Sequence, residues 1–398
     1  MNHRDRMLAA IRGEPTDQIP WAPRMDLWQI AQRSRGTLPE RFQGMNTVEI
    51  AIELGVACHC VQGDFTQPGG GDISLEGLAQ VNHRDFAYQV ELNDFPVEFK
   101  FESGDSFARI KTPAGDITSH IHRSQDMARE GISLPFRKSH VIESVKDFEG
   151  VAQIFEHLEV IPAPENFNAY KDRLGDQGIA IARGPVGASP VHLMLHDLMA
   201  MDQFFYLWHD EQNAIQELSE RMTPFYNRVL DVLIESDAEI VFWGANYDQD
   251  LTWPPFFEAE IVPWLKMASD RLHSVNKMLL THTDGENKGI LPYYESCGFD
   301  IAESVCTQPM TRCSLNEIRQ GVGPKATVWG GIPSVTLLDD SMSDEEYTAY
   351  MDELFGSLGT GERLILGVSD NVPPDANLTR LEDIKRRVEA FGPVDAQA

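Results

Sequence analysis

Two ligand-type side chains follow an apolar run in the stretch "KMLLTHTDG" at positions 277–285. His282 and Asp284 are two residues apart, which places both side chains on the same face of an extended strand. Imidazole nitrogens and carboxylate oxygens are ligands of zinc and of other divalent cations. The pair is also typical of an ordinary polar strand end, so a metal site needs further donors.

Carboxylates at the ends of two later apolar runs supply such donors. Glu303 lies near the end of "FDIAES" at 299–304, and Asp370 follows "RLILGV" at 363–368. Together with His282 and Asp284, these residues offer enough donors for one divalent cation. The sequence therefore predicts a metal site made of His282, Asp284, Glu303 and Asp370.

Arginines and an aspartate follow two of the earlier runs. Arg24 and Asp26 come after "IPWAP" at 19–23, and Arg183 ends "GIAIAR" at 178–183. An arginine can bind a substrate carboxylate through two parallel hydrogen bonds. A structural salt bridge to Asp26 or Glu303 is the alternative interpretation of either arginine.

Four further residues near run ends are candidates for substrate binding: Trp243, Asn246, Tyr247 and Trp329. The aromatic rings among them could stack on a planar ligand, although core packing is at least as common for such residues.

These candidates have to be positioned by a common framework, and eight short apolar runs provide one. The runs lie at 19–23, 57–61, 178–183, 239–244, 277–282, 299–304, 326–331 and 363–368. Most are followed by turn residues and a segment with helical periodicity, which indicates a parallel sheet covered by helices. Eight such units predict a closed (β/α)8 TIM barrel, whose active site lies at the carboxyl ends of the strands. An open doubly wound sheet is the alternative, but no strand is followed by its GxGxxG turn.

One region interrupts this alternation. Residues 97–121 alternate apolar and polar side chains around the turn signals "SGD" and "TPAGD",. We expect an antiparallel β-meander between the second and third barrel strands, in an insertion at about 85–125 of a single domain spanning 1–398.

Composition narrows the class of protein. The 62 acidic residues outnumber the 33 basic ones, and the net charge of -29 argues against nucleic acid and anionic membranes as partners,. No apolar segment has the length of a signal peptide or membrane span, so we expect a cytoplasmic protein. Five cysteines without a CxxC pair are expected to stay reduced,.

Several motifs together carry a family resemblance. From "RDRMLAAIRGEPTDQIPWAPRMDLW" through "THTDG", "WGGIPS" and "GVSDNVPPDAN", the chain resembles the uroporphyrinogen decarboxylase-like superfamily over nearly its whole length. This superfamily includes the haem-pathway decarboxylase and the zinc methyltransferases that move methyl groups to or from corrinoid proteins. The resemblance implies a (β/α)8 barrel.

The methyltransferase branch is the more similar one. Its zinc motif is His-x-Cys after strand five and a Cys before Pro-Pro after strand eight. The matching positions here are His282-x-Asp284, and Asp370 before Pro373 and Pro374. Both thiolates are thus replaced by carboxylates, which favours oxygen substrates over thiols. Glu303 resembles the acidic residue beside the zinc of methionine synthases.

The resemblance implies a metal-dependent enzyme that moves a methyl group from a small O-methyl donor, for example a methoxyaryl compound, to a corrinoid protein or another one-carbon carrier. Zinc is the expected metal, and His282, Glu303 and Asp26 are the expected catalytic residues. The chain has no Asp-x-His-x-x-Gly corrinoid-binding motif, so a corrinoid would come with a partner protein. Family members are often dimers, so a homodimer is one of the states expected here.

Two other functions fit the same residues. In a cofactor-free decarboxylase, Arg24 and Arg183 would hold the carboxylates of a porphyrinogen-like substrate, and Asp26 would stabilise a developing cation. In a non-catalytic binding barrel, the metal-site residues would not converge.

Overall fold

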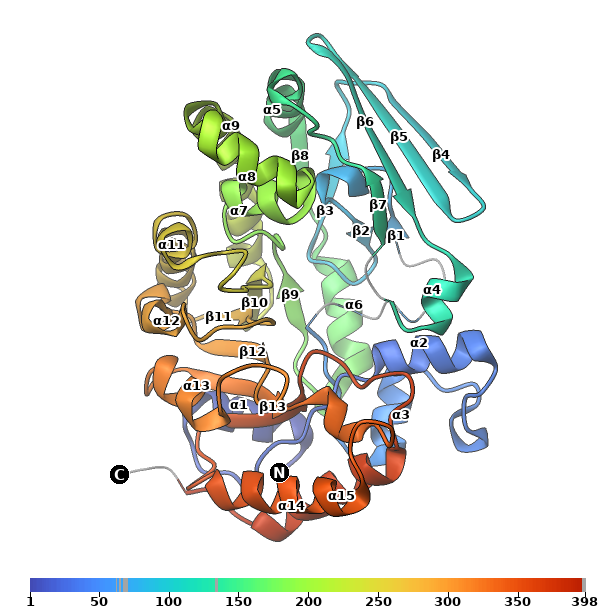
Figure 1. The fold of residues 1–398 in the computed structure, drawn as a ribbon, viewed down its shortest axis with the longest axis vertical. Coiled ribbons are helices and arrows are strands. Elements are labelled where there is room, and N and C mark those ends of the chain that lie inside the picture. Colours follow the sequence, from blue (N-terminus) through green and yellow to red (C-terminus); the bar gives the residue numbers. More distant parts are fainter. Residues whose placement is uncertain (62, 64–65, 67–70, 133–134, 396–398) are drawn as a thin grey trace.

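The computed structural model describes residues 1–61, 63, 66, 71–132 and 135–395. Its central element is a six-stranded parallel sheet in which neighbours in space are also neighbours in the chain (Figure 1). The strands are β9 (Ile181–Arg183), β10 (Ile240–Ala245), β11 (Met278–His282), β12 (Ile301–Val305), β13 (Thr327–Ile332) and β14 (Leu364–Val368). Six of the predicted runs are therefore confirmed as strands.

The runs at 19–23 and 57–61 were predicted as strands, and for both this prediction is wrong. Trp21 forms only a single parallel bridge to Leu366. Pro20 and Pro23 flank this bridge and have no N–H group to continue a ladder,. The two runs instead hydrogen-bond beside the two outer edges of the sheet, next to β14 on one side and just before β9 on the other.

The backbone hydrogen bonds of these segments connect β14 to the segment before β9. Ala22 N–H donates to Leu366 O at 2.9 Å, and Ala57 N–H donates to Trp21 O at 2.9 Å. Cys58 N–H then donates to Gln177 O at 2.7 Å, just before β9.

Side chains of the strands alternate between two hydrophobic clusters, as the two-residue period of a strand requires. Ile240 and Phe242 of β10 belong to the inner cluster, whereas Val241 and Trp243 belong to the larger outer cluster under the helices. All eight apolar segments supply the inner cluster, with Ala22, Ala57, Val61, Ile179, Ile181, Ile240, Phe242, Leu280, Ile301, Trp329 and Ile365 among its members.

Helix α1 (His3–Arg12) covers the amino ends of the strands. Its Met7, Leu8 and Ile11 belong to the inner cluster. Thr327, at the start of β13, and Arg363, just before β14, both donate to the Ile11 carbonyl. The carboxyl ends of the strands lie at the opposite end.

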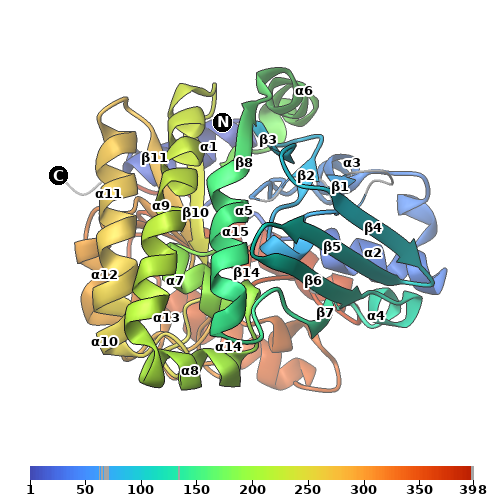
Figure 2. The ribbon, with the colours of Figure 1, turned by 90° about the horizontal axis from the view of Figure 1, so that it is seen from above.

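Helices cover the outer face of the sheet (Figure 2). At the start of α14 (Asp344–Ser357), Ser343 and Glu346 form a capping box,. The helices after β9 are α7 (Pro190–Leu193), α8 (Met201–Asp210), α9 (Gln212–Glu235), α10 (Pro254–Phe256), α11 (Val262–His273), α12 (Leu291–Cys297), α13 (Leu315–Gly321), α14 (Asp344–Ser357) and α15 (Leu378–Phe391). Before β9 lie α2 (Asp26–Arg35), α3 (Thr47–Leu54), α4 (Gln125–Arg129), α5 (Phe148–His157) and α6 (Pro164–Leu174).

Antiparallel strands lie between residue 61 and β9. Ser103 and Gly104, with φ of 53° and 86°, turn the chain between β4 and β5 at the predicted "SGD" signal,. The four-stranded sheet is β4 (Val97–Glu102), β5 (Asp105–Thr112), β6 (Gly115–His122) and β7 (Phe136–Ser139). Two further pairs are β3 (Tyr88–Leu92) with β8 (Leu158–Pro162), and β1 (Gly71–Asp72) with β2 (Asn82–His83). The antiparallel region therefore extends beyond the predicted range of about 85–125.

Within the described ranges, no helix has both the length and the apolar character needed to cross a membrane.

Gly244 is a position where the fold depends on glycine. Its φ is 77°, and an added Cβ would lie 2.1 Å from the Tyr247 hydroxyl and 2.7 Å from Ala188 Cβ. We expect Gly244→Ala to lower the free energy of unfolding by about 2–3 kcal/mol, measured by urea denaturation. Gly356→Ala in α14 is the matched control, because nothing lies within 4 Å of its added Cβ. The control should be neutral or slightly stabilising, and equal losses in both variants would contradict the interpretation.

Candidate active site

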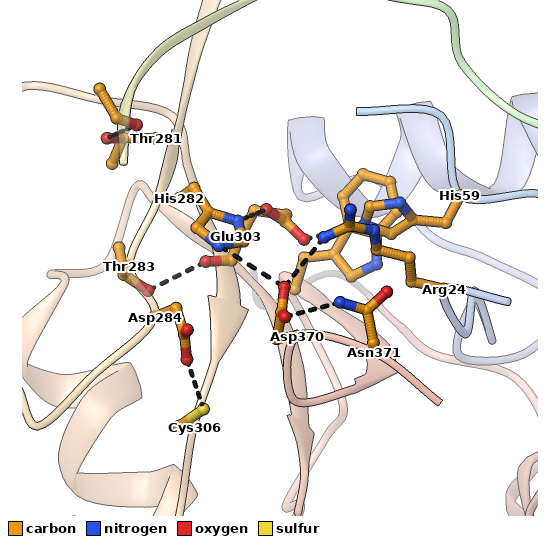
Figure 3. A network of polar contacts seen from close by, with 12 residues as sticks. Arg24, His59, Thr281, His282, Thr283, Asp284, Glu303, Cys306, Asp370 and Asn371 are labelled. Atoms are coloured by element: carbon orange, nitrogen blue, oxygen red, sulfur yellow. Dashed lines mark hydrogen bonds and ion pairs between the residues drawn. The ribbon is translucent and has the colours of Figure 1, made fainter. Parts of the chain in front are cut away.

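The polar residues at the carboxyl ends of β11, β12 and β14 form a connected network (Figure 3). His282 ends β11 and lies opposite Glu303 in the register of β11 with β12. The next pairing, of β12 with β13, shifts its register between Glu303 and Val305, where Ser304 has a φ of 60°. Such an irregularity directs a side chain away from the regular strand position. Asp370 follows β14 and also has a positive φ, of 54°.

A buried carboxylate lies between two histidines in this network. His282 Nδ1 lies 2.6 Å from Glu303 Oε2, and His59 Nε2 lies 2.8 Å from Glu303 Oε1. All three side chains are at most 5% exposed. Each carboxylate oxygen of Glu303 therefore fixes the orientation of one imidazole ring, and His282 Nε2 is directed away from Glu303.

The negative charge of Glu303 and a positive charge on His282 stabilise each other. Burial opposes the charge on Glu303, but His282 and then His59 outweigh it and hold the Glu303 pKa well below its usual range,. Burial alone would lower the pKa of His282, but Glu303, Asp370 and Asp284 together raise it above its usual value. The surrounding carboxylates therefore favour the protonated form of His282 more than water does for an isolated histidine.

Arg24 contacts two carboxylates, those of Asp26 and Asp370. Its Nη1 donates to Asp370 Oδ1 at 2.9 Å, and its Nε lies 3.1 Å from Asp26 Oδ1. Burial opposes the Arg24 charge, but Asp26 and Asp370 outweigh it, so the Arg24 pKa is raised. Asn371 also donates to Asp370, at 2.6 Å, and His282 Nε2 lies 3.6 Å from Asp370 Oδ1. The structural salt bridge weighed for Arg24 is thus present.

Asp284 lies on the other side of His282, where Cys306 Sγ donates to its Oδ1 at 3.0 Å (Figure 3). Burial, and then repulsion by Asp370, raises the pKa of Asp284. Burial, and then Asp284, raises the pKa of the Cys306 thiol, so Cys306 stays protonated.

The four predicted metal ligands are close together but do not surround one point. Both carboxylate oxygens of Glu303 are hydrogen-bonded to histidines, and Asp370 forms a salt bridge with Arg24. Within residues 1–61, 63, 66, 71–132 and 135–395, no group of three or more His, Cys, Asp and Glu side chains is arranged to hold a metal ion. The residues as arranged do not fit a four-ligand site, and metal binding stays a prediction.

A second polar cluster joins the antiparallel sheet to this site. Arg137 of β7 lies 2.6 Å from Asp197 Oδ1, and His196 Nδ1 lies 2.8 Å from Asp197 Oδ2. His196 Nε2 lies 3.1 Å from Asn246 Nδ2, and Asn246 N–H donates to the His282 carbonyl at 2.9 Å. His196 and Asp197 lie in a π-helical turn, Met194–Leu198, of a kind frequent at functional sites,. Asn246 thus connects the two clusters.

Two of the aromatic residues predicted to bind substrate lie in the core instead. Trp243 is fully buried, packs edge-on against Tyr226, and donates from Nε1 to Ala188 O. Tyr247 is also fully buried, and its hydroxyl pairs with Thr281 Oγ1 at 2.8 Å. Their side chains face the helices, so the structure gives both residues a packing role.

Trp329 and Arg183 face the inner side of the sheet. The Trp329 ring packs against His59 at 4.8 Å and so supports the histidine that holds Glu303. Arg183 lies over the rings of Phe86 and Phe242, at 5.6 and 5.8 Å. Burial lowers the pKa of Arg183 from its usual value. A hollow beside the site is lined in part by Arg24, Asp26 and His59.

His59, Arg137, His196 and Asp197 were missed as site residues. A histidine inside the apolar run "ACHCV" was a usable signal for His59, because an imidazole in a buried run needs a polar partner,. The adjacent His196 and Asp197 carry no such signal, since their partner Arg137 lies 60 residues away from Asp197.

Asp197 is expected to stabilise the fold through this second cluster. Burial opposes its charge, but His196 and Arg137 outweigh it and hold the Asp197 pKa below its usual value of 3.8. A depressed carboxylate pKa adds stability above the unfolded pKa and loses it as the pH falls. Asp197→Asn should therefore cost about 3 kcal/mol at neutral pH, and the difference from wild type should shrink below about pH 4 in urea denaturation. Asp126→Asn, at an exposed ion pair, is the control, and a pH-independent difference for Asp197→Asn would contradict the assignment.

Comparisons with known proteins agree with this architecture. A methyltransferase from Methanosarcina mazei matches with a TM-score of 0.57 and 15% sequence identity, covering 98% of this chain and 99% of that chain. At this identity the match shows a shared fold. No curated protein sequence matches the chain. The model of the uroporphyrinogen decarboxylase (URO-D) family matches residues 140–391, more than half of the chain, and this indicates an enzyme. The chain therefore belongs to the uroporphyrinogen decarboxylase family.

Proposed function

We propose that this chain is a methyltransferase that takes a methyl group from a small O-methyl donor, such as a methoxyaryl compound, and passes it to a corrinoid protein or another one-carbon carrier. The observation that carries the proposal is the buried His59–Glu303–His282 trio at the carboxyl ends of the strands, with His282 Nε2 directed toward Asp370. The family and the fold shared with a methyltransferase support it.

The proposal includes a closed (β/α)8 barrel built from the eight apolar segments, with the antiparallel sheet inserted between the second segment, at 57–61, and the third, at 178–183. Backbone hydrogen bonds from Leu366 through Ala22, Trp21 and Ala57 to Gln177 support closure, because they link β14 to the residues just before β9. The inner hydrophobic cluster, which has residues from all eight segments, supports it too. In such a barrel, the trio lies where barrel enzymes bind their substrates.

The proposed chemistry places His282 at the oxygen that loses the methyl group. When methyl leaves an ether, the remaining oxygen gains negative charge and needs a hydrogen-bond donor. Protonated His282 can donate from Nε2, since Glu303 holds its other nitrogen,. Arg24 adds positive charge on the same side, and Arg183 is the candidate for an anionic group of the donor,. Asp26 acts through Arg24.

A divalent cation, with zinc expected, would need a rearrangement of these side chains, because the described residues include no group of three arranged to hold a metal ion. It would then replace the proton on His282 Nε2, bind to His282, Asp284 and Asp370, and act as a Lewis acid on the same oxygen in place of the His282 hydrogen bond. Asp370 would have to release Arg24 to join such a site, and Glu303 would orient His282 through Nδ1 instead of binding the metal,. Zinc analysis of the purified protein tests this, and a content far below one ion per chain would contradict it.

The family description favours a decarboxylase as the second candidate. In that case Arg24 and Arg183 would bind substrate carboxylates. Arg24 already pairs with Asp26 and Asp370, so a substrate carboxylate would have to compete with two internal ones. This competition favours the methyltransferase proposal.

Incubation of the purified protein with methoxylated compounds and a reduced corrinoid protein tests the main proposal. We expect methylation of the corrinoid, seen in its absorption spectrum, and the matching hydroxyl product. Carbon dioxide release from a porphyrinogen-like acid, without any methyl transfer, would establish the second candidate instead. The proposed setting is the cytoplasm, in keeping with the five free cysteines,.

A further inference from the structure

The outer edge of the antiparallel sheet is an open strand. Among the described residues, β4 pairs only with β5, and Figures 1 and 2 show the sheet projecting from the body of the fold with β4 at its outer edge. An open edge offers unpaired N–H and C=O groups to another strand, and natural proteins usually block such edges. β4 has no proline and no bulge within it.

The hydrogen-bond pattern shows which residues of β4 face outward. Lys111 N–H donates to Pro96 O, so the even-numbered positions of this strand exchange hydrogen bonds with β5,. The backbone groups of Val97, Phe99 and Phe101 therefore point to the open edge. The side chains of Phe99 and Phe101 are 39% and 57% exposed, which is unusual for two phenylalanines on one strand,.

The sequence of this strand, "VEFKFE", is complementary to itself when it is reversed about Phe99. In an antiparallel pair of two copies, Phe99 would face Phe99 of the other copy, and Val97 would face Phe101. On the opposite face, Glu98 would face Lys100 in both directions. This register satisfies the outward backbone groups of Val97, Phe99 and Phe101 on both strands. It also places opposite charges in the cross-strand positions, where they stabilise pairing.

We infer that β4 is the contact strand of a homodimer, in which two antiparallel sheets join edge to edge about a two-fold axis at Phe99. The contact involves no residue of the candidate active site, and it does not depend on the proposed reaction. A two-fold contact of this kind uses the same patch on both subunits.

Charge reversal tests the pairing directly. The wild-type protein should sediment at twice its mass of 44.7 kDa. Lys100→Glu would place Glu98 opposite a glutamate twice, and Glu98→Lys would place Lys100 opposite a lysine twice. Each variant alone should dimerise at least about tenfold more weakly. A mixture of the two should form a heterodimer, because both cross-strand pairs are then again opposite in charge.

The mixture separates a lost contact from a misfolded variant, since a damaged strand would not recover on mixing. Glu98 also pairs with Lys111 of its own chain, but at the exposed surface, where such pairs contribute little,. A wild-type monomer at all concentrations, or a mixture that stays monomeric, would overturn the inference.

Cysteine crosslinking tests the register. Opposed hydrogen-bonded residues have Cα atoms about 5.5 Å apart, which suits a disulfide. Phe99→Cys should form a covalent dimer on mild oxidation, because the native cysteines are buried. Phe101→Cys is the matched control, since it would face Val97 and should stay uncrosslinked. Crosslinking of Phe101→Cys but not of Phe99→Cys would contradict the register.

Discussion

Replacing His282 with alanine is expected to lower the rate of methyl transfer by about a thousandfold, the scale on which a positioned acid contributes to catalysis. His282 is the member of the buried trio whose Nε2 does not contact Glu303, and the charges around it raise its pKa. The measurement is the rate of corrinoid methylation under saturating donor. The expected loss lies in kcat, because the hydrogen bond forms as the oxygen gains charge.

His209→Ala is the matched control, because the His209 side chain is 88% exposed in α8. It should change neither rate nor stability. Metal content adds a second readout for His282→Ala. If a cation is bound through His282 Nε2, zinc and activity should fall together. Full methyl-transfer activity of His282→Ala would show that His282 takes no part in the reaction.

Replacing Glu303 with alanine should have the largest effect on stability of any change at the site. Glu303 is 2% exposed and accepts hydrogen bonds from both His59 and His282. Its loss leaves two buried imidazoles without their partner, and breaking a buried charged pair costs about 3–5 kcal/mol. Urea denaturation measures the free energy of unfolding. Glu303→Gln, which keeps the size and one acceptor, should lose less stability.

The difference in unfolding free energy between wild type and Glu303→Gln should depend on pH, because the pKa values of Glu303 and His282 are both shifted. Glu303, with a depressed pKa, contributes above its unfolded value near 4.5 and loses this contribution as the pH falls,. His282, with a raised pKa, contributes below its unfolded value near 6.5 and loses this contribution as the pH rises,. The gap between wild type and Glu303→Gln should therefore be widest between about pH 4.5 and pH 6.5. A gap that grows steadily above pH 8 would contradict the ion pair.

The sequence predicts most of the parallel strands from apolar runs without proline, although the proline-free run at 57–61 does not form a strand. β10 to β14 all follow such runs. The run at 19–23 fails as a strand because prolines flank Trp21, although its hydrogen bonds still place it beside β14. Local sequence therefore indicates where a chain segment lies more reliably than whether its ladder is continuous.

The position of the site was predictable from the sequence, but the orientation of some of its side chains was not. Strand ends bring His282, Glu303 and Asp370 together, since carboxyl ends of parallel strands share one edge. Which face a side chain takes was not predictable in β10, where Phe242 and Trp243 are both apolar and only the fold decides that Trp243 turns outward. The pairing of Arg24 with Asp26 was anticipated, but its second partner was equally hidden, because Asp370 lies 346 residues away from Arg24 in the chain.

The position of α1 has a consequence for how molecules would come and go. This helix closes the amino end of the strands with Met7, Leu8 and Ile11. If the chain forms the proposed closed barrel and catalyses the proposed reaction, the donor, the carrier and the demethylated product would all have to enter and leave at the carboxyl ends of the strands. Binding would then be ordered. The small donor would bind first and the larger carrier would bind over it, and the demethylated product would be released only after the carrier dissociates.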